Sequence, residues 1–134
     1  MEKPMNVFDI AGRAMSAQLV RLNTTASNLA NAGSIAGTKE NAFRSLKPVF
    51  ETVGDRPGVA TVGVSRVVRS ELEPVKRHNP GHPLADPNGD VWEAGVDTSA
   101  ELIEMVESAR QYQNNVQVLQ TAKTLTLDTL RLGQ

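Results

Sequence analysis

The apolar residues of this 134-residue chain follow two helical patterns, one near each end. From residue 96 to residue 132 there is neither glycine nor proline, and apolar residues recur at alternating steps of three and four. This spacing predicts a long helix with an apolar face of the coiled-coil type. Such a helix would measure about 50 Å and could not cover its own apolar face. The recurring positions are Leu102, Met105, Ala109, Tyr112, Val116 and Leu119.

A second helical pattern covers residues 7–32 and is interrupted by a single glycine. Its apolar positions recur every seven residues, and smaller residues fill several positions between them. We therefore predict one structural unit with three parts: an N-terminal axial helix (1–32), a middle region (33–95) and a C-terminal axial helix (96–134), the two helices being packed as a coiled coil. The N-terminal heptad positions are Phe8, Met15, Leu22 and Leu29, with Gly12, Leu19 and Ala26 between them.

The middle region differs in kind, because it holds eight of the ten glycines and six of the seven prolines. Glycine and proline punctuate turns and loops. The alternating pattern of 59–68 predicts a strand, with 72–76 as its hairpin partner, while 43–50 is expected to be extended. Residues 78–90 are expected to form an irregular loop. The predicted fold class is therefore mainly α, with a small irregular middle segment that contains some β structure.

Sequence signals also mark the ends of the C-terminal helix. Thr98 followed by Glu101 three residues later predicts an N-cap with a capping box, and Gly133 predicts the stop. Glu107 and Arg110 are spaced to form an ion pair on the helix surface.

The apolar face of this helix changes direction after Leu119. Lys123 and Thr126 occupy the strict heptad positions, whereas Ala122 and Leu125 lie beside them. A break of this type changes the local supercoil. It indicates packing against several neighbours instead of one uniform partner.

Six amide side chains lie within ten residues on the flank of this face. Neutral donors and acceptors suit the repeated contacts of like subunits, since like charges would repel there. We interpret the cluster as interface hydrogen-bonding groups: Gln111, Gln113, Asn114, Asn115, Gln117 and Gln120.

Composition narrows the function classes. A net charge of −1 gives no electrostatic reason to expect nucleic-acid binding, and the absence of cysteine excludes a disulfide frame or a thiol catalyst. No apolar run approaches the ~18 residues of a membrane-spanning helix. The first residues show no apolar signal core, so any export is expected to proceed without a cleaved signal peptide.

The side chains that could bind a metal ion lie in one loop. The spacing of His78, His82 and Asp86 would suit a metal ion on a helix, but Pro80, Gly81 and Pro83 exclude a regular helix there. The Asp86–Asp90 segment is explained more simply as a tight turn than as a calcium loop. Hydrogen bonding within the loop is the favoured interpretation, and we expect no catalytic, cofactor or metal site.

Several motifs carry a family resemblance. They lie at 8–12, 15–18, 26–32, 79–89, 108–116 and 119–123. Together they resemble the bacterial flagellar rod and hook proteins, and within that family the proximal rod proteins. The resemblance covers nearly the whole chain in order.

This resemblance implies a structural protein, not an enzyme, which polymerises through its terminal helices into the hollow, torque-transmitting rod of the flagellar basal body. Its expected location is the rod that spans the periplasm. Its expected partners are further copies of itself, proximal and distal rod subunits and the flagellar type III export apparatus, with the MS ring and export gate as additional candidates. No nucleic acid and no small-molecule substrate is expected. Alternatives are another rod or hook protein, a two-helix adaptor, or a metal-dependent enzyme using the histidine loop.

The assembly interface expected from the heptad positions and the motifs comprises sixteen residues. They are Phe8, Met15, Leu19, Leu22, Asn28, Leu29, Asn31, Leu102, Met105, Ala109, Tyr112, Asn115, Val116, Leu119, Ala122 and Leu125.

Overall fold

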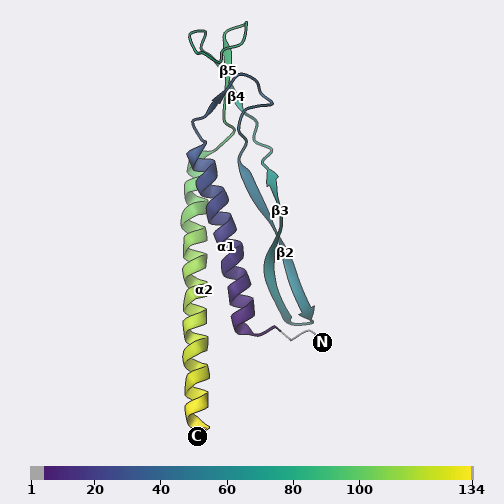
Figure 1. Ribbon diagram of the computed structural model, residues 1–134, viewed down its shortest axis with the longest axis vertical. Helices are drawn as coiled ribbons and strands as arrows, with labels where there is room; N and C mark the ends of the chain where they lie inside the picture. The colour runs from purple at the N-terminus through teal and green to yellow at the C-terminus, as the bar shows by residue number, and fades with distance from the viewer. Residues whose placement is uncertain (1–4, 134) are drawn as a thin grey trace.

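Residues 5–133 are described by a computed structural model, in which two long helices and five strands form an elongated molecule (Figure 1). The elements in chain order are α1 (Val7–Ala30), β1 (Ile35–Ala36), β2 (Leu46–Arg56), β3 (Val59–Arg69), β4 (Val75–His78), β5 (Asp90–Glu93) and α2 (Thr98–Leu132). Helices α1 and α2 lie side by side and run in opposite directions. The β2–β3 hairpin lies along α1, and a small sheet sits at the end remote from both termini.

The predicted fold class is wrong. Of the residues that the structure describes, 46% are helical and 26% are in strands, and two antiparallel sheets take the place of a mostly irregular middle segment. The glycines and prolines of the middle region lie largely at the turns between strands. Gly58 and Gly89 have a φ of 81°, the left-handed conformation that glycine adopts without strain. Their concentration reflects tight turns between strands, whereas the predicted fold class assigned the middle region a mostly irregular structure.

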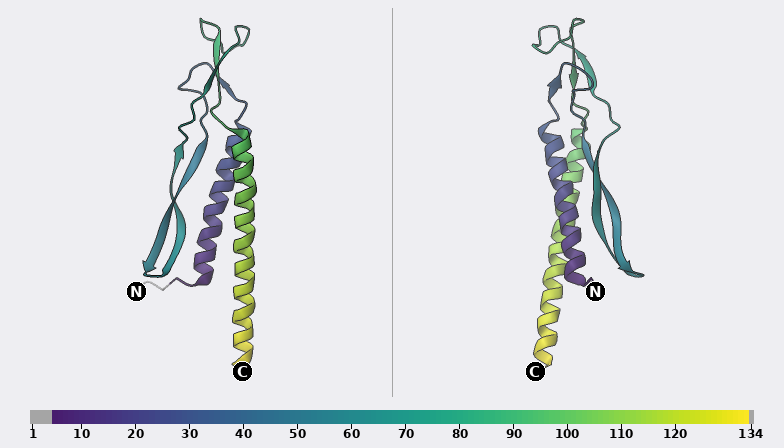
Figure 2. Two further views of the ribbon diagram at one scale, coloured as in Figure 1. Left: turned by 180° about the vertical axis from the view of Figure 1, so that it is seen from behind. Right: turned by 45° about the vertical axis from the view of Figure 1, so that its right-hand side comes forward.

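Strands β2 and β3 form an antiparallel hairpin of eleven residues on each side. The strand expected at 59–68 is confirmed as β3, but its partner is β2 and not 72–76. The expected extended segment 43–50 overlaps the beginning of β2, which continues to Arg56. Figure 2 shows the hairpin beside α1 from two further directions.

The second sheet, called here the distal sheet, has the strand order β1–β5–β4. Strand β5 pairs with β4 from Val75 opposite Glu93 to His78 opposite Asp90. Sequence reasoning missed β5, because its four residues directly follow a turn and are too few to show alternation. Val91 of β5 is only 2% exposed and anchors this sheet.

The helix ends agree only in part with the sequence signals. Asp97, not Thr98, is the N-cap of α2, and its side chain accepts a hydrogen bond from the Ala100 amide. The stop at Gly133 is confirmed. Glu107 lies 3.5 Å from Arg21 of α1, so the cross-helix contact takes the place of the expected pair with Arg110.

The buried interior consists mainly of small and polar side chains. An elongated molecule of this width has room for few large ones. Many large apolar residues therefore stay partly exposed within the described residues. Buried positions include Ala11, Ala17, Thr25, Asn28, Ala42, Ser45, Thr61, Asp90, Val91, Ala94, Glu101 and Ser108.

Candidate assembly surface

The centre of the α1–α2 contact is made by small or polar side chains. Thr25 of α1 is 3% exposed, and on α2 Glu101 is 6% and Ser108 0% exposed. The Ser108 hydroxyl donates to the Glu104 carbonyl oxygen of its own helix at 2.7 Å, which satisfies it without a partner from α1. Thr25 and Ser108 are short, so the centre of the contact holds little apolar surface, and the heptad residues stay half-buried or exposed.

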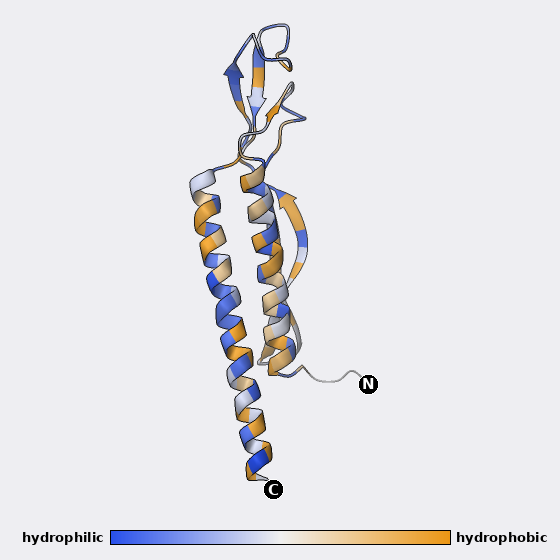
Figure 3. Ribbon diagram, turned by 60° about the vertical axis from the view of Figure 1, so that its left-hand side comes forward, coloured by the Kyte–Doolittle hydropathy of each residue, from blue (hydrophilic) through white to orange (hydrophobic). Residues whose placement is uncertain are grey.

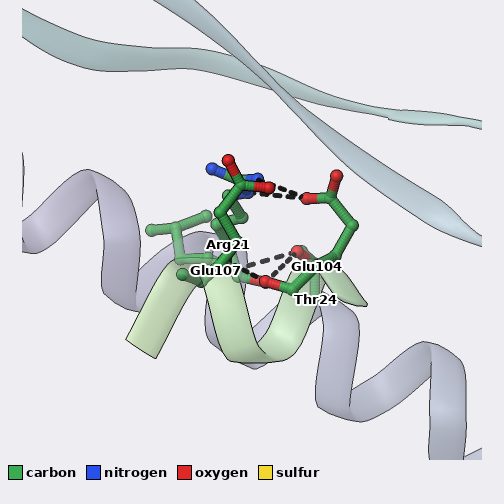
Figure 4. A network of polar contacts seen from close by, with 6 residues as sticks. Arg21, Thr24, Glu104 and Glu107 are labelled. Atoms are coloured by element: carbon green, nitrogen blue, oxygen red, sulfur yellow. Dashed lines mark hydrogen bonds and ion pairs between the residues drawn. The ribbon is translucent and has the colours of Figure 1, made fainter. Parts of the chain in front are cut away.

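An ion pair joins the helices on one side of this contact (Figure 4). The Arg21 guanidinium donates through Nε to Glu104 Oε2 at 2.7 Å, and its terminal nitrogen lies 2.6 Å from the same oxygen. Glu107 is within 3.5 Å of Arg21. A cleft of about 550 Å³ opens beside this pair and is also lined by Pro48 and Phe50 of β2. The ion pair therefore marks the side of the helix pair that faces the hairpin.

Leu19 and Leu102, two of the heptad residues, lie on the other side. Residues two apart on a helix are separated by about 200° around its axis. Leu19 precedes Arg21 by two residues, and Leu102 precedes Glu104 by two, so both point away from the hairpin side. Leu19 is 43% and Leu102 54% exposed.

The half-buried and exposed apolar residues on the face of the two helices turned away from the hairpin are called here the open groove. Its members from α1 and α2 are half-buried or exposed in the subunit. They are Leu19, Leu22, Ala26, Leu29, Leu102, Met105, Ala109 and Val116.

The other residues expected at the interface are distributed over both helices. Phe8 (41%) and Leu125 (62%) are exposed, and Phe8 lines a separate cleft of about 450 Å³ between α1 and the hairpin. The remaining half-buried members are Met15, Asn31, Tyr112, Asn115, Leu119 and Ala122.

Asn28 has a role within the subunit that sequence reasoning missed. Its side chain is 1% exposed. The amide nitrogen donates to the Leu46 carbonyl oxygen at 2.9 Å, and the amide oxygen accepts from the Leu46 N–H at 2.8 Å. Asn28 thus pairs with the first residue of β2 as a neighbouring strand would, and it fixes the hairpin to α1. Asn28 lies within the 26–32 motif, but the spacing of apolar residues does not distinguish its amide from that of Asn23 in the same helix.

A second hydrogen bond holds the other end of the hairpin against α1. The Thr61 hydroxyl of β3 donates to the Ile10 carbonyl oxygen of α1 at 2.9 Å, and Thr61 is 8% exposed. The hairpin is consequently held against α1 at both ends, which leaves the opposite face of the helices free.

Helix α2 extends beyond the start of α1, as Figures 1 and 2 show. Residues 123–132, called here the overhang, are all exposed. Figure 3 shows apolar residues interspersed with polar ones along this end of the helix. Its leucines carry exposures of 62% at Leu125, 44% at Leu127, 61% at Leu130 and 88% at Leu132.

The histidine loop is organised by internal hydrogen bonds. His78 Nδ1 lies 3.1 Å from Asp90 Oδ1, and Lys76 Nζ lies 3.2 Å from Asp90 Oδ2. Hydrogen bonds from His78, and then from Lys76, lower the pKa of Asp90 below its ordinary value of 3.8.

The turn that follows His78 is closed in the same way. His82 Nδ1 accepts from the Leu84 N–H, and Asp86 Oδ1 accepts from the Asp90 N–H at 2.9 Å. These side chains thus form hydrogen bonds within the loop, as the sequence favoured. Within residues 5–133 no three histidine or carboxylate side chains are grouped as metal ligands would be.

No helix in the described part of the chain combines the length and apolar character that crossing a membrane requires.

Comparison with known proteins identifies the family. Residues 8–33 match the family model described as flagella basal body rod protein, and residues 88–132 match that of the flagellar basal body rod FlgEFG protein C-terminal region. The flagellar basal-body rod protein FlgC of Salmonella typhimurium is 45% identical over 132 residues, covering 97% of this chain and 98% of that protein. The chain belongs to the FlgC family of flagellar basal-body rod proteins.

Other FlgC proteins agree with this assignment. FlgC of Yersinia enterocolitica is 45% identical over 133 residues, and FlgC of Buchnera aphidicola subsp. Schizaphis graminum is 38% identical over 136 residues, each covering 97% of this chain and 98% of the relative. The chain is therefore a structural subunit of the flagellar basal-body rod, which assembles with other rod components, and the resemblance found in the sequence is confirmed.

Proposed function

We propose that this chain is a proximal rod subunit that polymerises through the exposed faces of its two terminal helices. The observation that supports this proposal is the open groove, an apolar surface on the face of the helices turned away from the hairpin. Full burial of a leucine contributes about 1.5–3 kcal/mol, so covering Leu102, which is 54% exposed, would contribute about 1 kcal/mol. Several such residues along one face favour a helix of another subunit as the covering group.

The amide cluster supports the same proposal. In the subunit Gln111, Gln113 and Asn114 are exposed, and Asn115 beside them is half-buried. These groups would supply neutral hydrogen bonds at the edge of a helix contact between subunits, where charges of one sign would repel.

We also propose a role for each of the three parts of the chain. The helical segments 1–32 and 96–134 would form the axial part of one structural unit, and the strands of 33–95 would lie to its side. Expected partners are copies of this chain, other proximal and distal rod subunits and the type III export apparatus, with the MS ring and export gate as further candidates. We further propose that the subunit reaches the periplasm-spanning rod without a cleaved signal peptide, and that it has no catalytic activity.

A matched pair of substitutions tests the role of the groove. Leu102→Asp places a carboxylate in the groove, and Leu84→Asp makes the same change at a residue of similar exposure (50%, against 54% for Leu102) in the loop between β4 and β5. Burial of an unpaired charge costs several kcal/mol. We expect cells carrying Leu102→Asp to export the subunit but to lack complete rods in electron micrographs of basal bodies. Leu84→Asp should leave rods and swimming intact. Complete rods with Leu102→Asp would refute the proposal.

A further inference from the structure

Glu101 of α2 is a buried carboxylate that lacks a partner within the described part of the subunit. The residue is only 6% exposed, so its charge is almost completely removed from water. Within residues 5–133 its side chain forms no ion pair and no hydrogen bond, whereas Glu104, about one turn further along α2, is bonded to Arg21. A buried carboxylate without a partner is costly, because nothing replaces its lost hydration.

The beginning of α2 does not supply the missing partner. Asp97 is the N-cap, and its side chain accepts the hydrogen bond from the Ala100 amide. The Glu101 N–H donates to the Asp97 carbonyl oxygen as part of the helix. The partial positive charge at the start of a helix favours an acidic residue there, but no amide of this first turn donates to the Glu101 carboxylate. The carboxylate therefore keeps its capacity to accept hydrogen bonds from a cation.

The cleft of about 550 Å³ between the helix pair and β2 gives access to this carboxylate, because Glu101 is one of its lining residues. Pro48 and Phe50 of β2 and Ile103 of α2 line the same cleft. Phe50 is 37% and Ile103 67% exposed, so the walls offer apolar surface. A carboxylate between apolar walls matches a basic side chain, whose methylene stem packs on apolar surface while its charged end forms the ion pair.

Other cations match this cleft less well. Calcium and magnesium take about six oxygen ligands, whereas the cleft offers the carboxylates of Glu101 and Glu104, and Glu104 is already bonded to Arg21. Lys47 also lines the cleft, but it is exposed and forms no ion pair within residues 5–133. The cation that fits is one that enters from another molecule and brings its own apolar stem.

We propose that this cleft is a docking site for a lysine or arginine side chain of a neighbouring protein in the rod, with Glu101 as the ionic partner. The inference rests on the proposed function for the nature of the neighbour, but it concerns a second surface, since the cleft lies on the hairpin side and the open groove on the opposite face. Charge complementarity identifies the chemistry of the partner. A neighbour without a basic residue at this level would leave Glu101 buried and unpaired, which makes the site selective.

Opposite effects on the subunit and on the rod test the proposal. Glu101→Gln removes the charge with little change in size. Because this charge has no partner in the subunit, we expect the denaturation midpoint of the purified chain to stay the same or to rise. In cells, loss of the ion pair should reduce the number of complete rods at least tenfold while export is retained. Glu104→Gln is the matched control and should lower the midpoint, since it removes the ion pair with Arg21.

Titration with a single basic residue measures binding in the absence of the rod. The probes are the Nα-acetyl amides of lysine and arginine, added at millimolar concentration to the isotope-labelled chain, and the glutamine compound is the neutral control. The amide resonances of Thr25, Phe50 and Glu101 should shift with a basic probe and not with the neutral one. Glu101→Gln should lose this response. Leu102→Asp should keep it, because Leu102 points away from the hairpin side.

A midpoint that falls with Glu101→Gln would overturn the proposal, because it would show that a group of the same subunit pairs with Glu101. An equal fall with Lys47→Gln would identify that group as Lys47. Normal numbers of complete rods with Glu101→Gln would also overturn the proposal, as would the absence of a response to both basic probes. These failures differ from that of the proposed function, which complete rods with Leu102→Asp would refute while the probe response at Glu101 remained.

Discussion

Asn28 is the residue whose replacement should most directly separate the hairpin from the helices. Substitution by alanine removes both hydrogen bonds to Leu46 and leaves that residue's N–H and carbonyl without their partners at a buried site. Each bond contributes about 1–1.5 kcal/mol, and the unpaired groups add to the cost, so we expect a loss of about 3 kcal/mol. The loss should appear as local opening of the hairpin, since α1 and α2 keep their own contact.

Hydrogen exchange of the purified chain measures this opening. A change of about 3 kcal/mol corresponds to a more than hundredfold rise in the opening equilibrium of the β2–β3 amides, at 1.4 kcal/mol per factor of ten. The α2 amides near Ser108 should change far less. Asn23→Ala makes the same chemical change at an exposed position of α1 and should leave hairpin exchange unaltered.

Asn28→Asp refines the test, because it keeps an acceptor for the Leu46 N–H but directs a carboxylate oxygen at the Leu46 carbonyl. We expect it to be at least as harmful as the alanine variant at neutral pH. Hairpin amides that exchange within threefold of the unsubstituted chain in both variants would refute the reasoning that Asn28 holds the hairpin.

Five further outcomes can be measured. Gly95→Ala should destabilise the distal sheet in denaturant titrations, since a Cβ there would lie 2.5 Å from a backbone carbonyl oxygen. Gly12→Ala should instead stabilise α1 by up to about 1 kcal/mol, because no atom lies within 4 Å of the added group. Because the pKa of Asp90 is lowered, its carboxylate stabilises the distal sheet at pH values above 3.8, and this stabilisation is lost as the pH falls through the lower pKa of the folded state. Amide chemical shifts of the sheet, followed from pH 6 to 2, should show this transition. Asp90→Asn should abolish the transition. Leu119→Asp should block rod assembly with export retained, because a carboxylate would enter a helix contact. His82→Ala should leave motility nearly normal in swimming assays, since its ring only accepts a hydrogen bond within its own loop.

Local sequence patterns were sufficient to predict the two helices and one strand. The apolar residues at helical spacing predicted α1 and α2 nearly at their observed bounds, and the alternation of apolar and small residues predicted β3. The sequence pattern did not predict the partner of β3, because one proline and four charged residues interrupt the apolar pattern of 46–56. The pairing is decided by the turn at Gly58 and by contact with α1. The N-cap of α2 was displaced by one residue, since Asp97 and Thr98 are both good caps and only the backbone conformation selects between them.

The sequence by itself determined the family and the existence of two apolar helix faces, because motifs and periodicity are properties of residue order. It did not determine how those faces are oriented toward each other. The tertiary structure decided that short side chains such as Thr25 and Ser108 form the centre of the helix contact, and that Leu19 and Leu102 remain open on the side away from the hairpin. Rotation of a helix about its axis depends on the combined packing of all its neighbours, and here the hairpin, held by Asn28 and Thr61, occupies one side of α1. Residues far apart in sequence therefore decided which face the subunit offers to the next.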